Sequence, residues 1–364
     1  MNDENYTFNF MKENFVLASK QDVEGFKSTH WDVFDENFVK IMKRREVWPR
    51  MLRNALTLGL NDGLIKISNK RFAEGNEALW KILKKKQYED LIFDPEANGS
   101  QEKDLISFFH ETCALTSTDY VIENCMGDTG MPVCAKFKVK QNNNYKIINC
   151  NQHDLDDIFH SWFIINQLQD IPSENPVVCE IGAGYGGVAT KIKNNIMGAK
   201  IVIFDLPEVN AIQSYYLRKV FPDKIFKGYK DFLELGETIL KEKFDFLILP
   251  GWTISQFRKV HIVDAFINIR SFMEMNLNTI KFYLDSIQEL LKPNGFFACF
   301  NRNEKQLVSP NDNITIRFKD YPFDNNWSVL KSQVSAIQPH IHLLITRREK
   351  DTQNFNFGSI FENP

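Results

Sequence analysis

The chain has 364 residues, enough for two or three domains. Its 44 Lys and Arg residues are balanced by 47 Asp and Glu residues, so it lacks the basic field that holds nucleic-acid backbones. No segment approaches the roughly 20 apolar residues needed to cross a bilayer, and the first residues do not have the pattern of a signal peptide. We therefore expect a cytoplasmic protein with no nucleic-acid partner and no membrane span. The oligomeric state stays open, and a homo-oligomer is compatible with the sequence.

Residues 1–122 are expected to form a mainly helical N-terminal region. Apolar residues recur at spacings of three and four in 26–56 and 71–91, between lysine-rich faces. From Val133 to Val139 apolar residues alternate with lysines, and the extended segment YKIINC follows QNNN. This pattern predicts a β-hairpin within a connector at 123–152.

Between residues 153 and 350, short β-rich runs alternate with helical segments. A helix is expected at about 154–168, and the strand candidates lie at 177–181, 200–206, 244–249, 263–269, 296–300 and 340–348. Strands that alternate with helices predict an α/β domain, a Rossmann-like parallel sheet with helices on both faces. Residues 351–364 show no clear period and are expected to form a tail.

The first strand, VVCEI, leads into a turn with four glycines, GAGYGG. In a doubly wound sheet the ligand binds beyond the carboxyl ends of the strands, and the first strand-to-helix turn must let it approach the backbone. Gly182, Gly184 and Gly187 also satisfy the G-x-G-x-x-G spacing of dinucleotide sites. The glycines alone therefore leave a nicotinamide dinucleotide open as the ligand.

Acidic residues beside the turn favour a different ligand. Glu180 lies at the end of the first strand, where its carboxylate would repel a pyrophosphate but stabilise the cationic groups of S-adenosylmethionine. Asp205 ends the second strand, 23 positions after Gly182, at a spacing suited to a carboxylate that binds both ribose hydroxyls. Leu206 and Pro207 then offer an apolar edge for adenine. S-adenosylmethionine is the cofactor that these residues favour.

Two segments, NPVVCEIGAGYGG and FDLPEVNAIQSYYL, resemble motif I and the post-I region of class I S-adenosylmethionine-dependent methyltransferases. The segments VDAFINIRSFMEM, YLDSIQELLKPNGFFACFNR and GDTGMPVCAKF are similar to a bacterial family of sugar O-methyltransferases. Over about residues 125–302 the resemblance implies a methyltransferase that acts on a sugar hydroxyl in surface polysaccharide or lipopolysaccharide biosynthesis. It implies cofactor contacts at Glu180, Gly182, Gly184, Gly186 and Asp205. We also expect Ala183, between the glycines, and Leu206, after Asp205, to contact the cofactor.

Transfer of a methyl group to a hydroxyl requires a group that holds the acceptor and a group that takes its proton. The end of the fourth strand, NIRSFMEM, is the first place to look for both. Asn268 is expected to bond the methionine moiety, Arg270 to hold an anionic acceptor, and Glu274 to act as a base or metal ligand. A structural role near the start of a helix suits Glu274 equally well.

The helix before the first strand carries a second group of polar side chains, His153, Asp156, Asp157 and His160. His153, Asp157 and His160 share one face at metal-ligand spacings, but acids also suit the first turn of a helix, so we assign no metal site. His160 is a further candidate base. Trp252, after the third strand, suits stacking on a ligand or ordinary packing. Arg302, at the end of the fifth strand, suits an anionic acceptor or a surface ion pair.

Two other functions remain open. A nicotinamide-dependent sugar oxidoreductase or epimerase also uses a glycine turn and an acid after the second strand, although no Tyr-x-x-x-Lys pair follows the fourth strand. A non-catalytic binding protein would keep the same fold as a scaffold. It would bind the cofactor weakly or not at all.

Overall fold

A computed structural model describes residues 3–21, 102–125, 135–141, 144–150, 152–257, 261–308 and 313–349. The helical segments expected at 26–56 and 71–91, and the tail at 351–364, lie outside these residues. No helix within the described ranges is long and apolar enough to cross a bilayer. The proposed domain boundaries at residues 122 and 152 stay a prediction.

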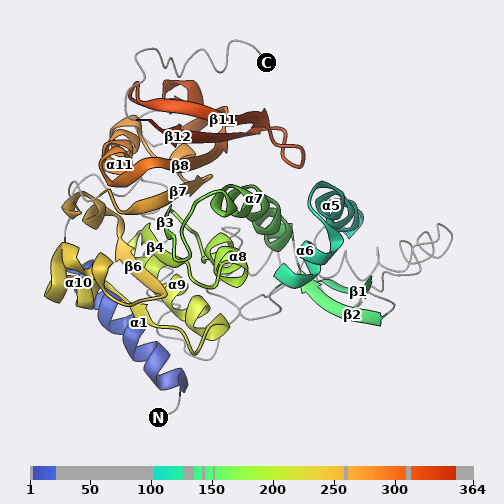
Figure 1. Ribbon diagram of the computed structural model, residues 1–364, viewed down its shortest axis with the longest axis horizontal. Coiled ribbons are helices and arrows are strands. Elements are labelled where there is room, and N and C mark those ends of the chain that lie inside the picture. Colours follow the sequence, from blue (N-terminus) through green and yellow to red (C-terminus); the bar gives the residue numbers. More distant parts are fainter. Residues whose placement is uncertain are drawn as a thin grey trace.

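The elements before the sheet are mainly helical. They are α1 (Asp3–Ser19), α5 (Glu102–Leu115), α6 (Thr118–Asn124), the strands β1 (Ala135–Gln141) and β2 (Asn144–Cys150), and α7 (Gln152–Gln169). β1 and β2 pair antiparallel from Ala135↔Cys150 to Gln141↔Asn144, so the expected hairpin is confirmed. Figure 1 shows this hairpin beside α5 and α6, at a distance from the central sheet.

The remaining elements alternate strands with helices. In chain order they are β3 (Val177–Ile181), α8 (Gly187–Asn195), β4 (Lys200–Asp205), α9 (Pro207–Val220), β5 (Phe226–Lys227), α10 (Tyr229–Leu235), β6 (Phe246–Pro250), β7 (Val263–Ile269), α11 (Leu277–Leu290), β8 (Leu291–Arg302), β9 (Glu304–Val308), β10 (Asn313–Arg317), β11 (Trp327–Val334) and β12 (Ile341–Arg348). Short 3-10 helices intervene as η2 (Gly236–Lys241), η3 (Gly251–Gln256), η4 (Phe272–Glu274) and η5 (Phe318–Asp320).

Eight strands form one sheet in the order β11-β12-β8-β7-β3-β4-β6-β5 (Figure 1). The strands from β5 to β8 pair parallel. The order reverses at β3, which lies between β4 and β7, and this switch point is where doubly wound sheets bind ligands. The Rossmann-like α/β fold is therefore confirmed, with each of the six expected strands present.

The far end of the sheet corrects the expectation of an all-parallel sheet. β12 pairs antiparallel with β8, and β11 pairs antiparallel with β12. The strand expected at 340–348 thus exists but runs the opposite way. β11 went unrecognised because its alternating residues are largely half-exposed, as suits an edge strand, so it lacks the continuous apolar run of the central strands.

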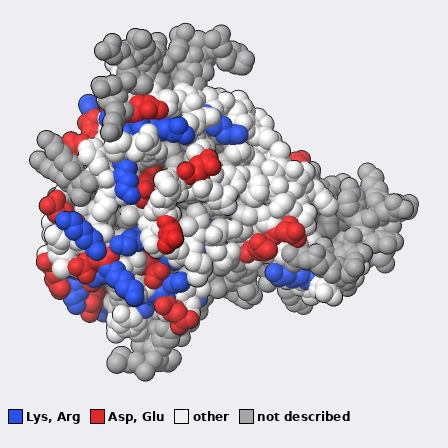
Figure 2. Space-filling view, in the orientation of Figure 1, with Lys and Arg blue, Asp and Glu red and all other residues white. Residues whose placement is uncertain are grey.

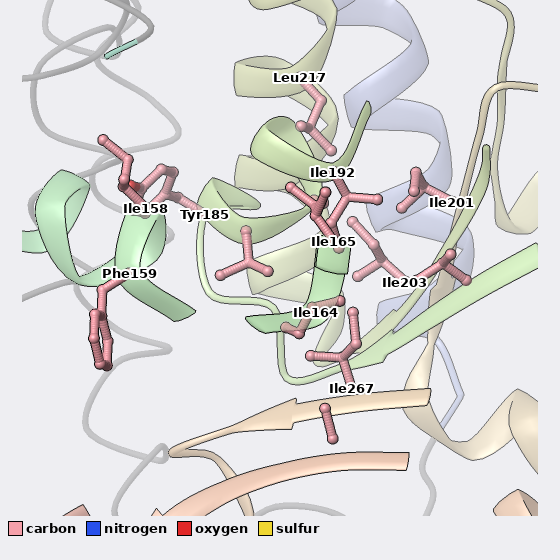
Figure 3. Close-up of a cluster of buried hydrophobic side chains, with 14 of the residues drawn as sticks. Ile158, Phe159, Ile164, Ile165, Tyr185, Ile192, Ile201, Ile203, Leu217 and Ile267 are labelled. Carbon is pink, nitrogen blue, oxygen red and sulfur yellow. The ribbon is translucent and has the colours of Figure 1, made fainter. Parts of the chain in front are cut away.

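Both faces of the sheet are covered by helices, as the burial of β4 illustrates. Ile201 and Ile203 point into an apolar cluster shared with α7, α8 and α9, whereas Val202 and Phe204 point into a second cluster shared with α10 and α11. Figure 3 shows the first cluster, in which Ile192 of α8 and Leu217 of α9 lie near the two β4 isoleucines. These two cores hold the carboxyl ends of the strands rigidly at one edge.

Helix α1 packs against the outer side of the sheet domain, on α9 and α10 (Figure 1). The guanidinium carbon of Arg218 lies 4.5 Å from the ring centre of Tyr6 and 5.1 Å from that of Phe10. Such cation–π contacts contribute about 0.5–2 kcal/mol. The first helix therefore belongs structurally with the sheet domain.

Figure 2 shows basic and acidic side chains interspersed over one face of the molecule, with a broad area of other residues between them. A mixed surface of this kind provides no extended basic track on the described part of that face.

Candidate functional site

A cavity of about 390 Å³ lies at the carboxyl ends of β3, β4, β7 and β8, beneath α7. Its lining includes most of the residues expected from the sequence: His160, Glu180, Gly182, Ala183, Gly184, Asp205, Leu206, Arg270 and Glu274. Gly186, Trp252 and Asn268 do not line it. The cavity thus brings together residues that are up to 114 positions apart, from His160 to Glu274.

The glycine turn after β3 has a backbone that other residues rarely adopt. Gly182, Gly184 and Gly186 have φ angles of 70°, 57° and 94°. At Gly182 there is also no room for a side chain, because an added Cβ would lie 2.2 Å from Ser271 Oγ. At Gly187 a Cβ would lie 1.9 Å from the Asp157 carboxylate. The turn therefore holds β7 and α7 close to the end of β3.

Glu180, at the end of β3, is the most telling residue of the cavity. It is only 3% exposed, and its Oε2 atom has no hydrogen-bond partner in the described structure. Burial raises the pKa of this carboxyl to about 8, and the nearby Asp157 and Asp205 raise it further in the same direction. A buried acid without a cation is costly to ionise, so this position favours a cationic ligand group.

Asp205, at the end of β4, is a second acid in the cavity and is half-buried. Its carboxylate accepts hydrogen bonds from Leu206 N at 2.8 Å and from Gln213 Nε2 at 2.7 Å. Burial nevertheless raises its pKa to about 7. Gln213 also donates to the Gly184 carbonyl at 2.8 Å, so it ties the end of β4 to the glycine turn. Gln213 was not expected from the sequence, although its position eight residues after Asp205, in the helix that follows β4, was a usable signal.

Asn268 organises the protein instead of facing a ligand. Its side chain is fully buried and donates to the Ile181 carbonyl at 3.0 Å and to Ser271 Oγ. Its oxygen accepts from Phe272 N at 3.1 Å and from Asn301 Nδ2 at 2.9 Å. These four bonds use the whole capacity of the amide. Ser271, which the sequence analysis did not single out, lines the cavity in its place.

Arg270 follows β7 in a left-handed conformation, with a φ of 61°. Its backbone N–H donates to the Phe300 carbonyl at 2.8 Å, which fixes the turn. Such a conformation costs about 1 kcal/mol or more in a residue other than glycine, and it often marks a functional position. The Arg270 side chain reaches Asp156 of α7, with 3.4 Å between Nη1 and Oδ2.

Asp156 is buried above the cavity between two partners. Its Oδ1 atom accepts from Gln338 Nε2 at 2.7 Å, and its other oxygen faces Arg270. Burial raises the pKa of Asp156 to about 7 even though Arg270 acts to lower it. Asp156 belongs to the polar group expected on this helix, whereas Gln338 was not expected to bear on the site. The contact depends on the strand pair β11–β12, which brings residue 338 back over α7.

His160 lies on the side of α7 that lines the cavity and is 1% exposed. Its ring packs against Phe159 and Phe300, with 5.6 Å between ring centres in each case. Burial and then Arg270 lower the pKa of His160 to about 3, so the ring is neutral at pH 7. One ring nitrogen hydrogen-bonds the Asp156 backbone, whereas Nε2 has no partner in the described structure. Nε2 is therefore a lone-pair acceptor at the cavity wall.

Two further expected site residues, Glu274 and Trp252, already have partners within the protein. Glu274, in η4, forms an ion pair with Lys305, with 3.0 Å between Oε1 and Nζ. Trp252, in η3, packs edge-to-face on Tyr229 with 6.4 Å between ring centres, in the apolar cluster of α10 and α11. Asp157 accepts a hydrogen bond from the Tyr185 hydroxyl. Within the described ranges, no three His, Cys, Asp or Glu side chains are arranged to hold a metal ion.

Neither a protein-family model nor a curated protein sequence matches the chain. Solved structures that resemble it include the mitomycin 7-O-methyltransferase MmcR, at 11% identity over 54% of this chain and 57% of that one, with a TM-score of 0.30. The pyocyanin biosynthetic protein PhzM matches at 11% identity over 53% and 56% of the two chains, with a TM-score of 0.34.

A third structure is the phosphoethanolamine N-methyltransferase 2 of Haemonchus contortus in complex with S-adenosyl-L-methionine. It matches at 14% identity over 41% of this chain and 30% of that one, with a TM-score of 0.28. The chain thus spans between 30% and 57% of the length of these three proteins. At such identities and TM-scores the likeness does not establish an activity for this chain.

Proposed function

We propose that the protein is an S-adenosylmethionine-dependent O-methyltransferase that methylates a hydroxyl group of a sugar. The observation that carries the proposal is the Glu180 carboxyl, which is buried beside the glycine turn with one oxygen unpartnered. A cationic ligand group would stabilise the ionised form of this acid, whereas a pyrophosphate would be repelled by it.

The residues around the switch point have the chemistry that S-adenosylmethionine requires. Glu180 Oε2 is free to accept from the ammonium group, and Asp205 lies at the end of β4 where ribose hydroxyls bind in doubly wound folds. Leu206 and Val209 add apolar surface for adenine. When bound, S-adenosylmethionine supplies a methyl group already activated by a sulfonium.

His160 is the better candidate for the group that takes the hydroxyl proton. Its Nε2 has no partner in the described structure and is neutral at pH 7, and its pKa of about 3 must rise toward 7 when cofactor and acceptor bind for it to take the proton. Glu274 is the second candidate, but its ion pair with Lys305 competes with that role. Arg270 contacts one carboxylate oxygen of Asp156, and Gln338 contacts the other. We assign to Arg270 the role of holding the acceptor near His160.

The sugar acceptor and the role in surface polysaccharide or lipopolysaccharide biosynthesis rest on the resemblance of VDAFINIRSFMEM and YLDSIQELLKPNGFFACFNR to sugar O-methyltransferases. The cavity is consistent with a polar acceptor. Its lining includes the Ser271 hydroxyl and the charged side chains of Arg270, Glu274, Arg302 and Lys305.

Calorimetric titration with S-adenosylhomocysteine and, separately, with NAD tests the proposal against its alternatives. We expect S-adenosylhomocysteine to bind and NAD to bind far more weakly. Tighter binding of NAD would indicate a nicotinamide-dependent oxidoreductase or epimerase. Failure of both ligands to bind would indicate a non-catalytic protein that keeps the fold as a scaffold.

A further inference from the structure

Charge is divided along the cavity according to the order of the strands. Glu180 and Asp205 end β3 and β4, and both are acidic. Arg270 follows β7 and Arg302 ends β8, on the other side of the switch point. Because the four strands are adjacent in the order β8-β7-β3-β4, the cavity has an acidic end and a basic end.

The basic end gathers side chains from separate segments of the chain. Lys305 of β9 and His340, which precedes β12, line the cavity together with the two arginines. The pKa of His340 is lowered by partial burial, then by Arg302 and Arg270. His340 therefore lies within the electrostatic reach of both guanidinium groups, and the three side chains form one cluster.

The charges of this cluster are only partly neutralised by the protein. Lys305 is paired with Glu274 at 3.0 Å. Arg270 faces Asp156 at 3.4 Å, but the pKa of Asp156 is raised to about 7, so this acid is only partly ionised at neutral pH. Arg302 is exposed, and its side chain makes no hydrogen bond or ion pair with the part of the chain that the structure describes. A net positive charge is therefore left facing the cavity.

We infer that the acceptor carries an anionic group, a carboxylate or a phosphate, which Arg302 and Arg270 bind at the basic end of the cavity. The identification of the bound molecule as a methyl acceptor rests on the proposed function. The anion subsite itself does not depend on methyl transfer. A guanidinium group presents paired N–H donors that match the two oxygens of a carboxylate or phosphate.

The backbone of Arg270 supports this reading. Its left-handed conformation is held by the bond to the Phe300 carbonyl, so the side chain leaves the turn in a fixed direction. Pre-positioned donors lose less entropy when a ligand binds. A group bound there would lie next to His160, whose pKa Arg270 also lowers. The anionic group would thus place a neighbouring hydroxyl between the basic end and the acidic end.

His340 offers a direct readout of anion binding. An anion on Arg302 and Arg270 would offset their effect, so the pKa of His340 should rise toward its ordinary value. We would follow the His340 ring signals by NMR across a pH titration at constant ionic strength, with assignment by loss of the signal in His340→Gln. The probes are inorganic phosphate, D-glucuronate and D-glucose 6-phosphate, with D-glucose as the neutral control.

In the wild-type protein at least one of the three anions should raise the pKa of His340, and D-glucose should not. Arg302→Gln should abolish the response. Arg317→Gln is the matched control, because Arg317 is an exposed arginine that is paired with Glu304 at 2.9 Å and does not line the cavity. A stronger response to D-glucuronate would select a carboxylate, and a stronger response to D-glucose 6-phosphate would select a phosphate.

No response to any anion, or an equal response in Arg302→Gln, would overturn the inference. The same samples titrated with S-adenosylhomocysteine separate this outcome from failure of the proposed function. If the anion response is present but S-adenosylhomocysteine does not bind, the subsite stands and the methyltransferase proposal fails. If S-adenosylhomocysteine binds without an anion response, only the subsite is wrong.

Discussion

The two ends of the cavity are built in different ways. The acidic end comes from one short stretch, residues 180–205, which contains a strand end, the glycine turn and the next strand end. The basic end combines α7, the turn after β7, the end of β8, β9 and the segment before β12. A local motif can therefore specify the first end, whereas only the completed sheet brings the second together.

The two ends also differ in burial. Glu180 is buried and Asp205 is half-buried, and both have raised pKa values, whereas Arg302 and His340 are exposed. An enclosed charge contributes to binding through strong local electrostatics, and an exposed one is screened by water and salt. We therefore expect substitutions at the acidic end to have larger effects than those at the basic end.

Gly182→Ala should have the largest effect. Its φ is 70° and the new Cβ would lie 2.2 Å from Ser271 Oγ, so the turn must shift. We expect binding of S-adenosylhomocysteine to fall by at least about 100-fold and the free energy of unfolding to fall by about 2–3 kcal/mol. Calorimetry and chemical denaturation measure the two quantities.

Gly236→Ala is the matched control for this variant. Gly236 has a φ of 57°, but a Cβ there meets nothing within 4 Å and the residue is remote from the cavity lining. It should cost about 1–3 kcal/mol of stability, because its φ of 57° and ψ of −144° suit glycine, and leave ligand binding unchanged. Equal losses of ligand binding in the two variants would mean that the close approach of Ser271 to the turn has no role in binding.

His160→Gln should lower the rate of methyl transfer by about 10²–10⁴-fold, the usual contribution of a positioned base. Binding of S-adenosylhomocysteine should change little, because the His160 ring packs on Phe300 of β8, whereas the expected cofactor residues lie at the ends of β3 and β4. The assay follows transfer of a labelled methyl group from S-adenosylmethionine to whichever anionic sugar the His340 titration selects.

Glu274→Gln provides the comparison for His160→Gln. Because Glu274 is paired with Lys305, we expect its loss to lower the rate by less than about tenfold. A large loss of rate in Glu274→Gln together with full activity in His160→Gln would reverse the assignment of the base.

Glu180→Gln should change how stability depends on pH. In the folded, ligand-free protein the pKa of Glu180 is about 8, against an ordinary value of 4.5, so the unfolded chain releases this proton first as the pH rises. Glu180 therefore destabilises the wild type increasingly between pH 4.5 and 8. The stability of the wild type minus that of Glu180→Gln should fall by about 1.4 kcal/mol per pH unit in this window.

Chemical denaturation of both proteins at pH 5, 6, 7 and 8 measures this difference. The comparison between variants is needed because His160 has the opposite slope. Its lowered pKa makes the folded state more stable as the pH rises from about 3 to 6.5. A stability difference that does not vary with pH would show that Glu180 is ionised in the ligand-free protein.

The sequence predicted the acidic end of the cavity well and the basic end poorly, for physical reasons. Glu180, the glycines and Asp205 are close in sequence, and a parallel sheet places adjacent strand ends at one edge. By contrast, the Asp156–Gln338 bond joins residues 182 positions apart and depends on the antiparallel pair β11–β12, which had not been recognised.

Asn268 shows a second limit of reading the sequence. Its position after β7 was correct for a ligand contact, but its amide is saturated by Ile181, Ser271, Phe272 and Asn301. No local pattern shows whether a polar side chain at a strand end turns toward the ligand or toward the neighbouring strand. Trp252 illustrates the same point, because its ring packs on Tyr229.

The proton balance of ligand binding tests the central claim most directly. With a pKa of about 8, Glu180 carries its proton at pH 7, and a cationic ligand should displace it. Calorimetric titration with S-adenosylmethionine at pH 7, in two buffers that differ in ionisation enthalpy, should show net release of protons in the wild type and less release in Glu180→Gln. Binding with no release or with proton uptake, or tighter binding of NAD than of S-adenosylmethionine, would contradict it.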